Sequence, residues 1–108
     1  MSKFDDFIDV IEEGVKELAK KTLKGFKDEA VTDTKAFLDA SKEDLKRWTK
    51  LLAQGELSQD DFKWLVLGRK DVAELHALKQ AGLALVGIDR FKNALLDLVI
   101  DTAFDVFL

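Results

Sequence analysis

The sequence predicts an all-α protein, an antiparallel helical hairpin of two long helices around a turn at residues 54–58. Three observations indicate this fold class: the composition, one marked turn near the middle of the chain, and the spacing of the apolar residues. The 108-residue chain contains no proline and is 47% hydrophobic and 35% charged. Proline costs a helix interior about 3 kcal/mol, so its absence permits long helices. The apolar content is too high for a disordered protein.

The turn is marked by residues that end one helix and begin another. Gly55 suits the left-handed position after the last helical turn, with Leu57 free to fold back onto that turn. Ser58 can cap the next helix, and Asp61 follows three residues later in place of the usual Glu or Gln of a capping box. We therefore expect a helix over 3–54, a turn at 55–58 and a helix over 59–107, within a single domain 1–108.

The apolar residues of the first half recur at helical spacing. Steps of four and three separate Phe4, Ile8, Ile11, Val15 and Leu18. The stripe resumes with a shift of one residue near Leu23 and runs on to Leu52. This heptad pattern, with one slip in phase, is typical of helices that pack along a single seam.

The second half is apolar on more than one face. From residue 94 to the end of the chain, the polar residues are Asp97, Asp101, Thr102 and Asp105. A helix of this kind needs more than one neighbour, which predicts self-association of two hairpins into a homodimeric four-helix bundle. The main alternative is a monomer whose helices break at Gly25, Gly82 or Gly87 and fold back into a compact bundle of shorter helices.

Charge and cysteine content exclude several classes of function. The chain has no cysteine, which excludes disulfides, thiolate catalysis and cysteine metal sites. A net charge of −4 argues against nucleic acid as a partner, because such surfaces need surplus Lys and Arg. The first residues are acidic and lack the layout of a signal peptide, so we expect a cytoplasmic location.

No constellation of residues predicts catalysis, a metal or a cofactor. His76 is the single histidine, and a di-metal carboxylate bundle needs paired Glu-x-x-His motifs, whereas residue 73 is Ala. The turn at Gly55 lacks the carboxylate ladder of a calcium loop. Phosphate-binding loops and nucleophile elbows are also missing from the sequence. We therefore interpret His76 as a helix-surface residue.

A stripe of lysines occupies the first helix. Lys16, Lys20, Lys24 and Lys27 follow at steps of four, four and three, and so share one face of the expected helix. Such a face can contact anionic lipid or nucleic acid. Because acidic residues lie on neighbouring turns, as in a Glu12–Lys16 pair, we favour a solvated face.

The C-terminal helix carries a polar residue at every fourth position. These residues are Asp89, Asn93, Asp97, Asp101 and Asp105. In a hairpin this end lies beside the acidic N-terminus, and four phenylalanines gather with it. The resulting candidate interaction surface comprises Phe4, Phe7, Asp97, Asp101, Phe104, Asp105 and Phe107, and it suits a basic or amphipathic protein segment. The competing and simpler interpretation is that the rings fill the open end of the bundle and the Asp row marks its solvent line.

Three functional hypotheses follow. The first is a non-enzymatic, self-associating helical protein that acts as a structural or protein-interaction module. The second is a peripheral lipid-binding or coat-type protein whose hairpin opens so that its C-terminal helix lies on an apolar surface. It is the weaker one, because a carboxylate every four residues does not suit a membrane span and interfacial helices usually carry Lys and Arg. The third is a small enzyme or metal-binding bundle that uses His76.

Overall fold

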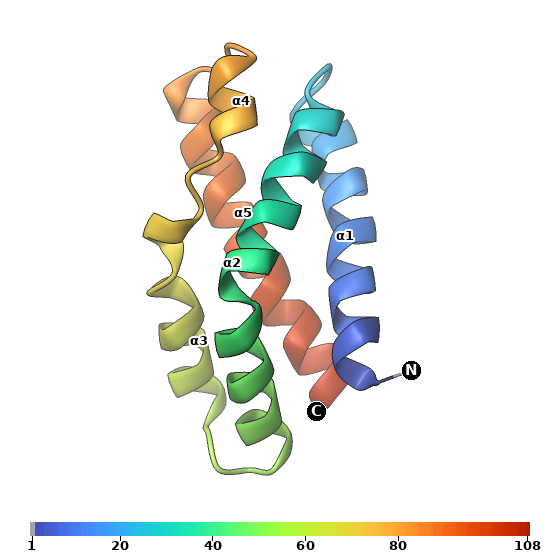
Figure 1. Cartoon of the computed structure of the whole chain (residues 1–108), viewed down its shortest axis with the longest axis vertical. Helices are drawn as coiled ribbons and strands as arrows, with labels where there is room; N and C mark the ends of the chain where they lie inside the picture. The colour runs from blue at the N-terminus through green and yellow to red at the C-terminus, as the bar shows by residue number, and fades with distance from the viewer. Residues whose placement is uncertain (1) are drawn as a thin grey trace.

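The computed structural model describes residues 2–108, and they form an all-α bundle (Figure 1). The helices are α1 (Lys3–Thr22), α2 (Lys27–Ala53), α3 (Gln59–Leu67), the 3₁₀ turn η1 (Lys70–Val72), α4 (His76–Gln80) and α5 (Leu85–Phe107). The described residues contain no strand, so the predicted fold class is confirmed. None of these helices has the length and apolar character needed to cross a membrane. The molecule measures 42 × 26 × 20 Å along its principal axes.

Serine caps begin α1 and α3 in the same way. The backbone N–H of Asp5 donates to Ser2 Oγ at 3.2 Å, and that of Asp61 donates to Ser58 Oγ at 3.1 Å. Each cap satisfies an N–H group that the helix leaves free, and acidic residues in the first turn complement the helix dipole. The predicted cap at Ser58 is thereby confirmed.

The predicted turn between the two halves of the chain is also confirmed. Gly55 has a φ of 75°, which is the left-handed conformation that glycine adopts without steric cost. The N–H of Leu57 donates to the carbonyl of Leu51 at 3.2 Å, so the chain folds back onto the last turn of α2. Leu57 packs against the core as expected.

The continuous helix expected over 3–54 is wrong, because the chain reverses at residues 23–26. Gly25 has a φ of 87°, and the N–H of Phe26 donates to the carbonyl of Leu23 at 2.9 Å. The reversal lays α1 and α2 against each other, so each covers the other's apolar stripe. Leu23 is only 6% exposed, which shows that the turn itself closes the end of the core.

The single helix expected over 59–107 is likewise wrong. It divides into α3, η1, α4 and α5, with Leu75 left-handed at a φ of 55° and Gly82 at 93°. These breaks let short segments bury Ala73, Leu75 and Leu78, each at most 3% exposed. Gly87, in contrast, lies inside α5. The predicted alternative therefore gives two of the breaks correctly, at glycines 25 and 82, and it misses the interruption between α3 and α4.

Helix α5 is the central element of the bundle. It packs against α1, α2, α3 and α4, and in Figure 1 it runs behind α2. Phe91, Leu95, Leu96 and Val99 on successive turns are all at most 2% exposed. A helix that is apolar on several faces therefore finds its neighbours within one copy of the chain. A second copy of the chain is therefore not needed to cover the apolar faces of α5.

Two polar side chains attach the segment after α3 to α2. The carboxylate of Asp33 accepts hydrogen bonds from the backbone N–H groups of Ala77 and Leu78, both at 2.9 Å, and so caps α4. Arg69 donates to the carbonyl of Ala40 at 3.0 Å and to Ser41 Oγ at 3.2 Å. Its guanidinium also pairs with Asp44, again on α2, at 3.0 Å.

Candidate protein-interaction groove

The two ends of the chain meet at one end of the bundle, as the sequence predicted. Figure 1 shows the N- and C-termini side by side. The ring of Phe7 lies 5.6 Å from that of Phe107 in an edge-on arrangement, and 5.7 Å from that of Phe4. Aromatic pairs at such distances stabilise by about 0.5–1.5 kcal/mol beyond the area that they bury. The expected gathering of phenylalanines therefore exists.

These rings pack inside the molecule. Phe7 is fully buried and Phe4 is 8% exposed, while Phe104 and Phe107 are partly buried against the core. Phe104 also lies 5.9 Å from the ring of Phe62 on α3. The phenylalanines thus fill the open end of the bundle, and at most their edges are available to a partner.

The three aspartates of the candidate surface remain exposed on α5. Asp97 and Asp101 border a shallow α1–α5 groove of about 410 Å³, together with Gly14 and Leu18. The helices come close there because Gly14 has no side chain, and a Cβ at that position would lie 3.0 Å from Leu98 Cδ1. Asp105 lies outside this groove. The structure therefore places the predicted phenylalanines together inside the bundle, and it leaves the three predicted aspartates exposed on α5.

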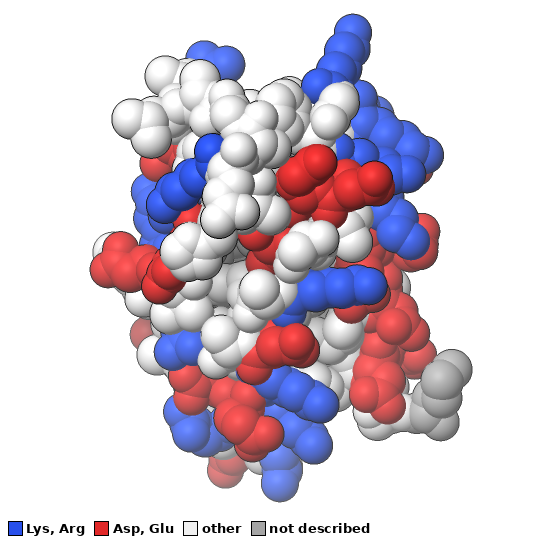
Figure 2. Space-filling view, turned by 45° about the horizontal axis from the view of Figure 1, so that its top comes forward, with Lys and Arg blue, Asp and Glu red and all other residues white. Residues whose placement is uncertain are grey.

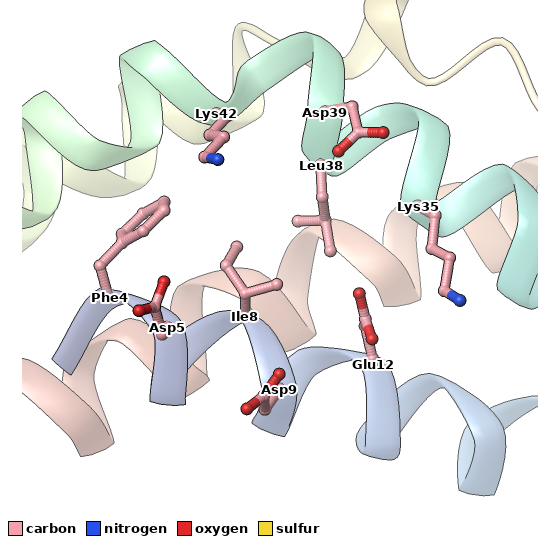
Figure 3. Close-up of a pocket in the computed structure, with 9 residues that line it drawn as sticks. All are labelled: Phe4, Asp5, Ile8, Asp9, Glu12, Lys35, Leu38, Asp39 and Lys42. Carbon is pink, nitrogen blue, oxygen red and sulfur yellow. The ribbon is translucent and has the colours of Figure 1, made fainter. Parts of the chain in front are cut away.

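Another groove lies between α1 and α2 (Figure 3). It encloses about 280 Å³, and we call it the α1–α2 groove. Its residues are Phe4, Asp5, Ile8, Asp9 and Glu12 from α1, and Lys35, Leu38, Asp39 and Lys42 from α2. In Figure 3 Ile8 and Leu38 point into the gap between the two helices, with Phe4 towards one end. The floor is thus apolar and the rim is charged.

The rim of the α1–α2 groove has a surplus of negative charge. The rim carries four carboxylates and two lysines, and within residues 2–108 none of the six forms an ion pair. Charged groups without a partner in the free protein are available to a ligand of opposite charge. An apolar floor with a few polar groups around it is the usual composition of a binding site. The side chains that line the groove therefore offer both apolar and charged contacts to a ligand.

Among these nine residues, only Phe4 belongs to the interaction surface that the sequence predicts. The signal that it missed is a shared spacing, because acids at 5, 9 and 12 and charged residues at 35, 39 and 42 both follow steps of four and three. Each set marks one helical face. Only the reversal at residues 23–26 shows that the two faces border the same groove.

The other residues that the sequence singled out lie apart from this groove. His76 is exposed and its side chain contacts that of Glu74. Across residues 2–108, no three His, Asp or Glu side chains are grouped to hold a metal ion. The expected lysine stripe is divided by the reversal, and Lys16 pairs with Glu13 at 3.1 Å rather than with Glu12. 

Comparison with known proteins gives no relative from which a function can be inferred. No protein-family model, curated protein sequence or solved structure matches the chain. The α1–α2 groove and its charged rim are the features of this structure that suggest a function.

Proposed function

We propose that the protein is a non-enzymatic helical interaction module whose α1–α2 groove binds a basic, amphipathic segment of another protein. The observation that supports this proposal is the apolar floor between two charged helix faces that lack ion-pair partners. Amphipathic helices commonly bind in such grooves by placing apolar residues on the floor and charged residues along the rim. A basic segment matches the surplus of carboxylates.

The two parts of the groove contribute differently to binding. Leu38 is 3% exposed and Ile8 is partly buried, so an apolar side chain from a partner completes a surface that is already mostly covered. Burying one such side chain contributes about 1.5–3 kcal/mol. The carboxylates at Asp5 and Asp9 add less affinity, because exposed ion pairs contribute about 0–1 kcal/mol, but they raise the association rate and select basic partners.

The test uses two synthetic amphipathic helical peptides with the same leucine spacing, one rich in lysine and the other rich in glutamate. We expect fluorescence anisotropy to show saturable binding of the lysine peptide alone. Ile8→Lys, which adds a charge to the groove floor, should abolish that binding. Val10→Lys is the matched control, because Val10 lies outside the groove and is 49% exposed. Equal binding of both peptides, or equal loss in both variants, contradicts the proposal.

A homodimer is a separate part of the proposed function. The apolar stripes are covered within one copy, so self-association needs an exposed apolar residue. Trp64 on α3 is 74% exposed, and Leu65 beside it is 36% exposed. Tryptophan is enriched among the residues that dominate protein interfaces. We therefore propose the exposed face of α3 as the contact between two copies, on the side of α2 away from α1.

A further inference from the structure

Two turns meet at the end of the bundle opposite the termini. Figure 1 shows the α1–α2 turn and the α4–α5 turn both at the top of the molecule. At this end the α1–α2 turn lies near the start of α5, because Thr22 and Leu23 line a pocket of about 310 Å³ together with Gly87 and Arg90 of α5. We call residues 20–29 and 76–90 the distal end.

The distal end exposes two aliphatic side chains. Leu85 is 79% exposed and Val86 is 63% exposed, and both belong to the first turn of α5. Neither side chain lines any of the pockets described above, so both lie on the outer surface at the start of α5. Residues 75–88 contain no Asp or Glu. An apolar tip without carboxylates is unusual on a chain in which acidic residues outnumber basic ones.

The distal end is also basic. It contains six basic and three acidic side chains, although the whole chain has a net charge of −4. The basic residues, all exposed, are Lys20, Lys21, Lys24, Lys27, Lys79 and Arg90. Figure 2 shows Lys and Arg side chains at the upper right, over the α1–α2 turn, and uncharged surface at the upper left, over α4.

Few of these positive charges are neutralised. Among the residues that the structure describes, Lys20 is the only one of the six in an ion pair, with Glu17 at 3.7 Å. Of the three acids, Asp89 pairs with Lys70, which lies outside the distal end, at 3.6 Å. Asp28 and Glu29 begin α2, where the helix dipole favours negative charge. The lysines of the α1–α2 turn are therefore available to an anionic surface.

We propose that the distal end binds an anionic lipid surface. The lysines lie over the head groups, and Leu85 and Val86 enter the boundary between head groups and acyl chains. Basic clusters bind anionic membranes with a contribution from each Lys or Arg, and buried aliphatic side chains add to it. A lipid surface fits better than a protein, because protein interfaces favour Trp, Tyr and Arg anchors and use Leu and Val less often. The helices stay packed, so the α1–α2 groove remains formed.

Vesicle flotation tests whether the lysines of the distal end contribute to membrane binding. We expect the protein to float with phosphatidylcholine vesicles that contain phosphatidylserine and not with phosphatidylcholine alone, and added salt should weaken the binding. A contribution of about fivefold per lysine predicts a loss of roughly 100-fold for the Lys21→Gln, Lys24→Gln, Lys27→Gln variant. The control variant has the same change in charge outside the distal end: Lys46→Gln, Lys50→Gln and Lys63→Gln. Absence of phosphatidylserine-dependent flotation, or equal loss in both variants, overturns the proposal.

A second pair of variants tests whether Leu85 and Val86 contribute to membrane binding. Leu85→Gln with Val86→Gln should reduce flotation, whereas Val10→Gln, at an exposed apolar residue outside the distal end, should leave it unchanged. Because the chain has no cysteine, a polarity-sensitive dye can be attached at Val86→Cys or, as control, at Val10→Cys. The dye at position 86 alone should shift to the blue on anionic vesicles. If the apolar variant floats like the wild type and neither dye shifts, the distal end only attracts anions, and the proposal is wrong.

Discussion

Asp33 connects two segments that are far apart in the sequence. Its carboxylate is buried, at 6% exposure, and accepts hydrogen bonds from Ala77 and Leu78, 44 and 45 residues further along the chain. A cap normally comes from the residue just before a helix, but Leu75 in that position has no side chain that can accept a hydrogen bond. The short helix α4 therefore depends on a side chain of α2.

We expect Asp33→Ala to lower the free energy of unfolding by about 1–3 kcal/mol, because it leaves the buried N–H of Leu78 without an acceptor. Asp33→Asn should cost less, since its amide oxygen can still accept one of the two bonds. Asp39→Ala, which removes an exposed carboxylate from the same helix, should change stability by at most about 0.5 kcal/mol. Urea denaturation measures all three. Equal effects at positions 33 and 39 would show that the cap adds no stability.

The contrast between Ser58 and Asp33 shows what can be predicted at the scale of residues. Ser58 caps α3 by accepting a hydrogen bond from the N–H of Asp61, three residues later, so its role can be predicted from the local sequence. Asp33 looks like any helix carboxylate until the fold brings α4 beside α2. Phe4 and Phe7 were correctly placed near the C-terminal phenylalanines, but their burial depends on how α1 packs, which spacing alone does not determine.

At the scale of elements, the reversal at Gly25 decides how the first half of the chain packs. The sequence shows a slip in phase near Leu23 but no cluster of Ser, Asn, Asp or Pro flanking the glycine, and it therefore predicts a continuous helix. The left-handed conformation of this one residue is what lets α1 pair with α2. Stripe patterns predict which faces are apolar. They do not specify whether a helix finds its neighbour in the same chain or in another copy.

We expect Gly25→Ala to destabilise the protein by about 1–2 kcal/mol, because a Cβ disfavours the left-handed conformation. A Cβ at this position would meet nothing within 4 Å, so the cost would come from the backbone alone. Gly25→Asn should recover part of the loss, since Asn tolerates this conformation better than Ala does. Thermal unfolding ranks the three proteins. If Ala and Gly are equally stable, the turn has another conformation in solution.

The segment from residue 68 to residue 84 should be the least protected part of the bundle. It contains a 3₁₀ turn of three residues and a helix of five, and its hydrogen bonds to α2 are those of Arg69 and Asp33. Local opening costs less free energy where backbone hydrogen bonds are few and short-range. Hydrogen exchange followed by NMR should therefore show faster exchange at these amides than in α2 and α5. The same protection in α4 as in α5 would contradict this ranking.

At the scale of the whole molecule, one group of acidic side chains and one group of basic side chains lie at opposite ends of the long axis. Acidic residues gather near the termini, around Asp5, Asp9 and Asp101, and the basic residues of the distal end lie at the opposite side. The sequence showed both groups of charges, and its lysine stripe was interpreted as a solvated face. The sequence suggests lipid contact separately for the lysine stripe and for the C-terminal helix, but it does not place exposed apolar residues beside the lysines. The apolar residues next to the lysines come from a segment about sixty residues later, so only the fold reveals the combination.

The predicted homodimer belongs to this scale. We expect size exclusion with light scattering to give twice the 12.2 kDa mass of the chain, and Trp64→Gln to reduce it to the monomer. The variant removes an exposed ring and should leave the fold intact, as circular dichroism can verify. A monomeric wild-type protein would contradict the homodimer. It would leave the groove proposal untouched, because the α1–α2 groove is formed within one copy.

The contact between Phe7 and Phe107 has a consequence for how the bundle can be joined to other proteins. Because it holds the first and last helices together, the chain enters and leaves the bundle at nearly the same point. A domain with neighbouring termini can be inserted into a surface loop of a host without forcing the host's own ends apart. Inserted in this way, the bundle would stand out from its host along a 42 Å axis, with the lysines and Leu85 at its free tip.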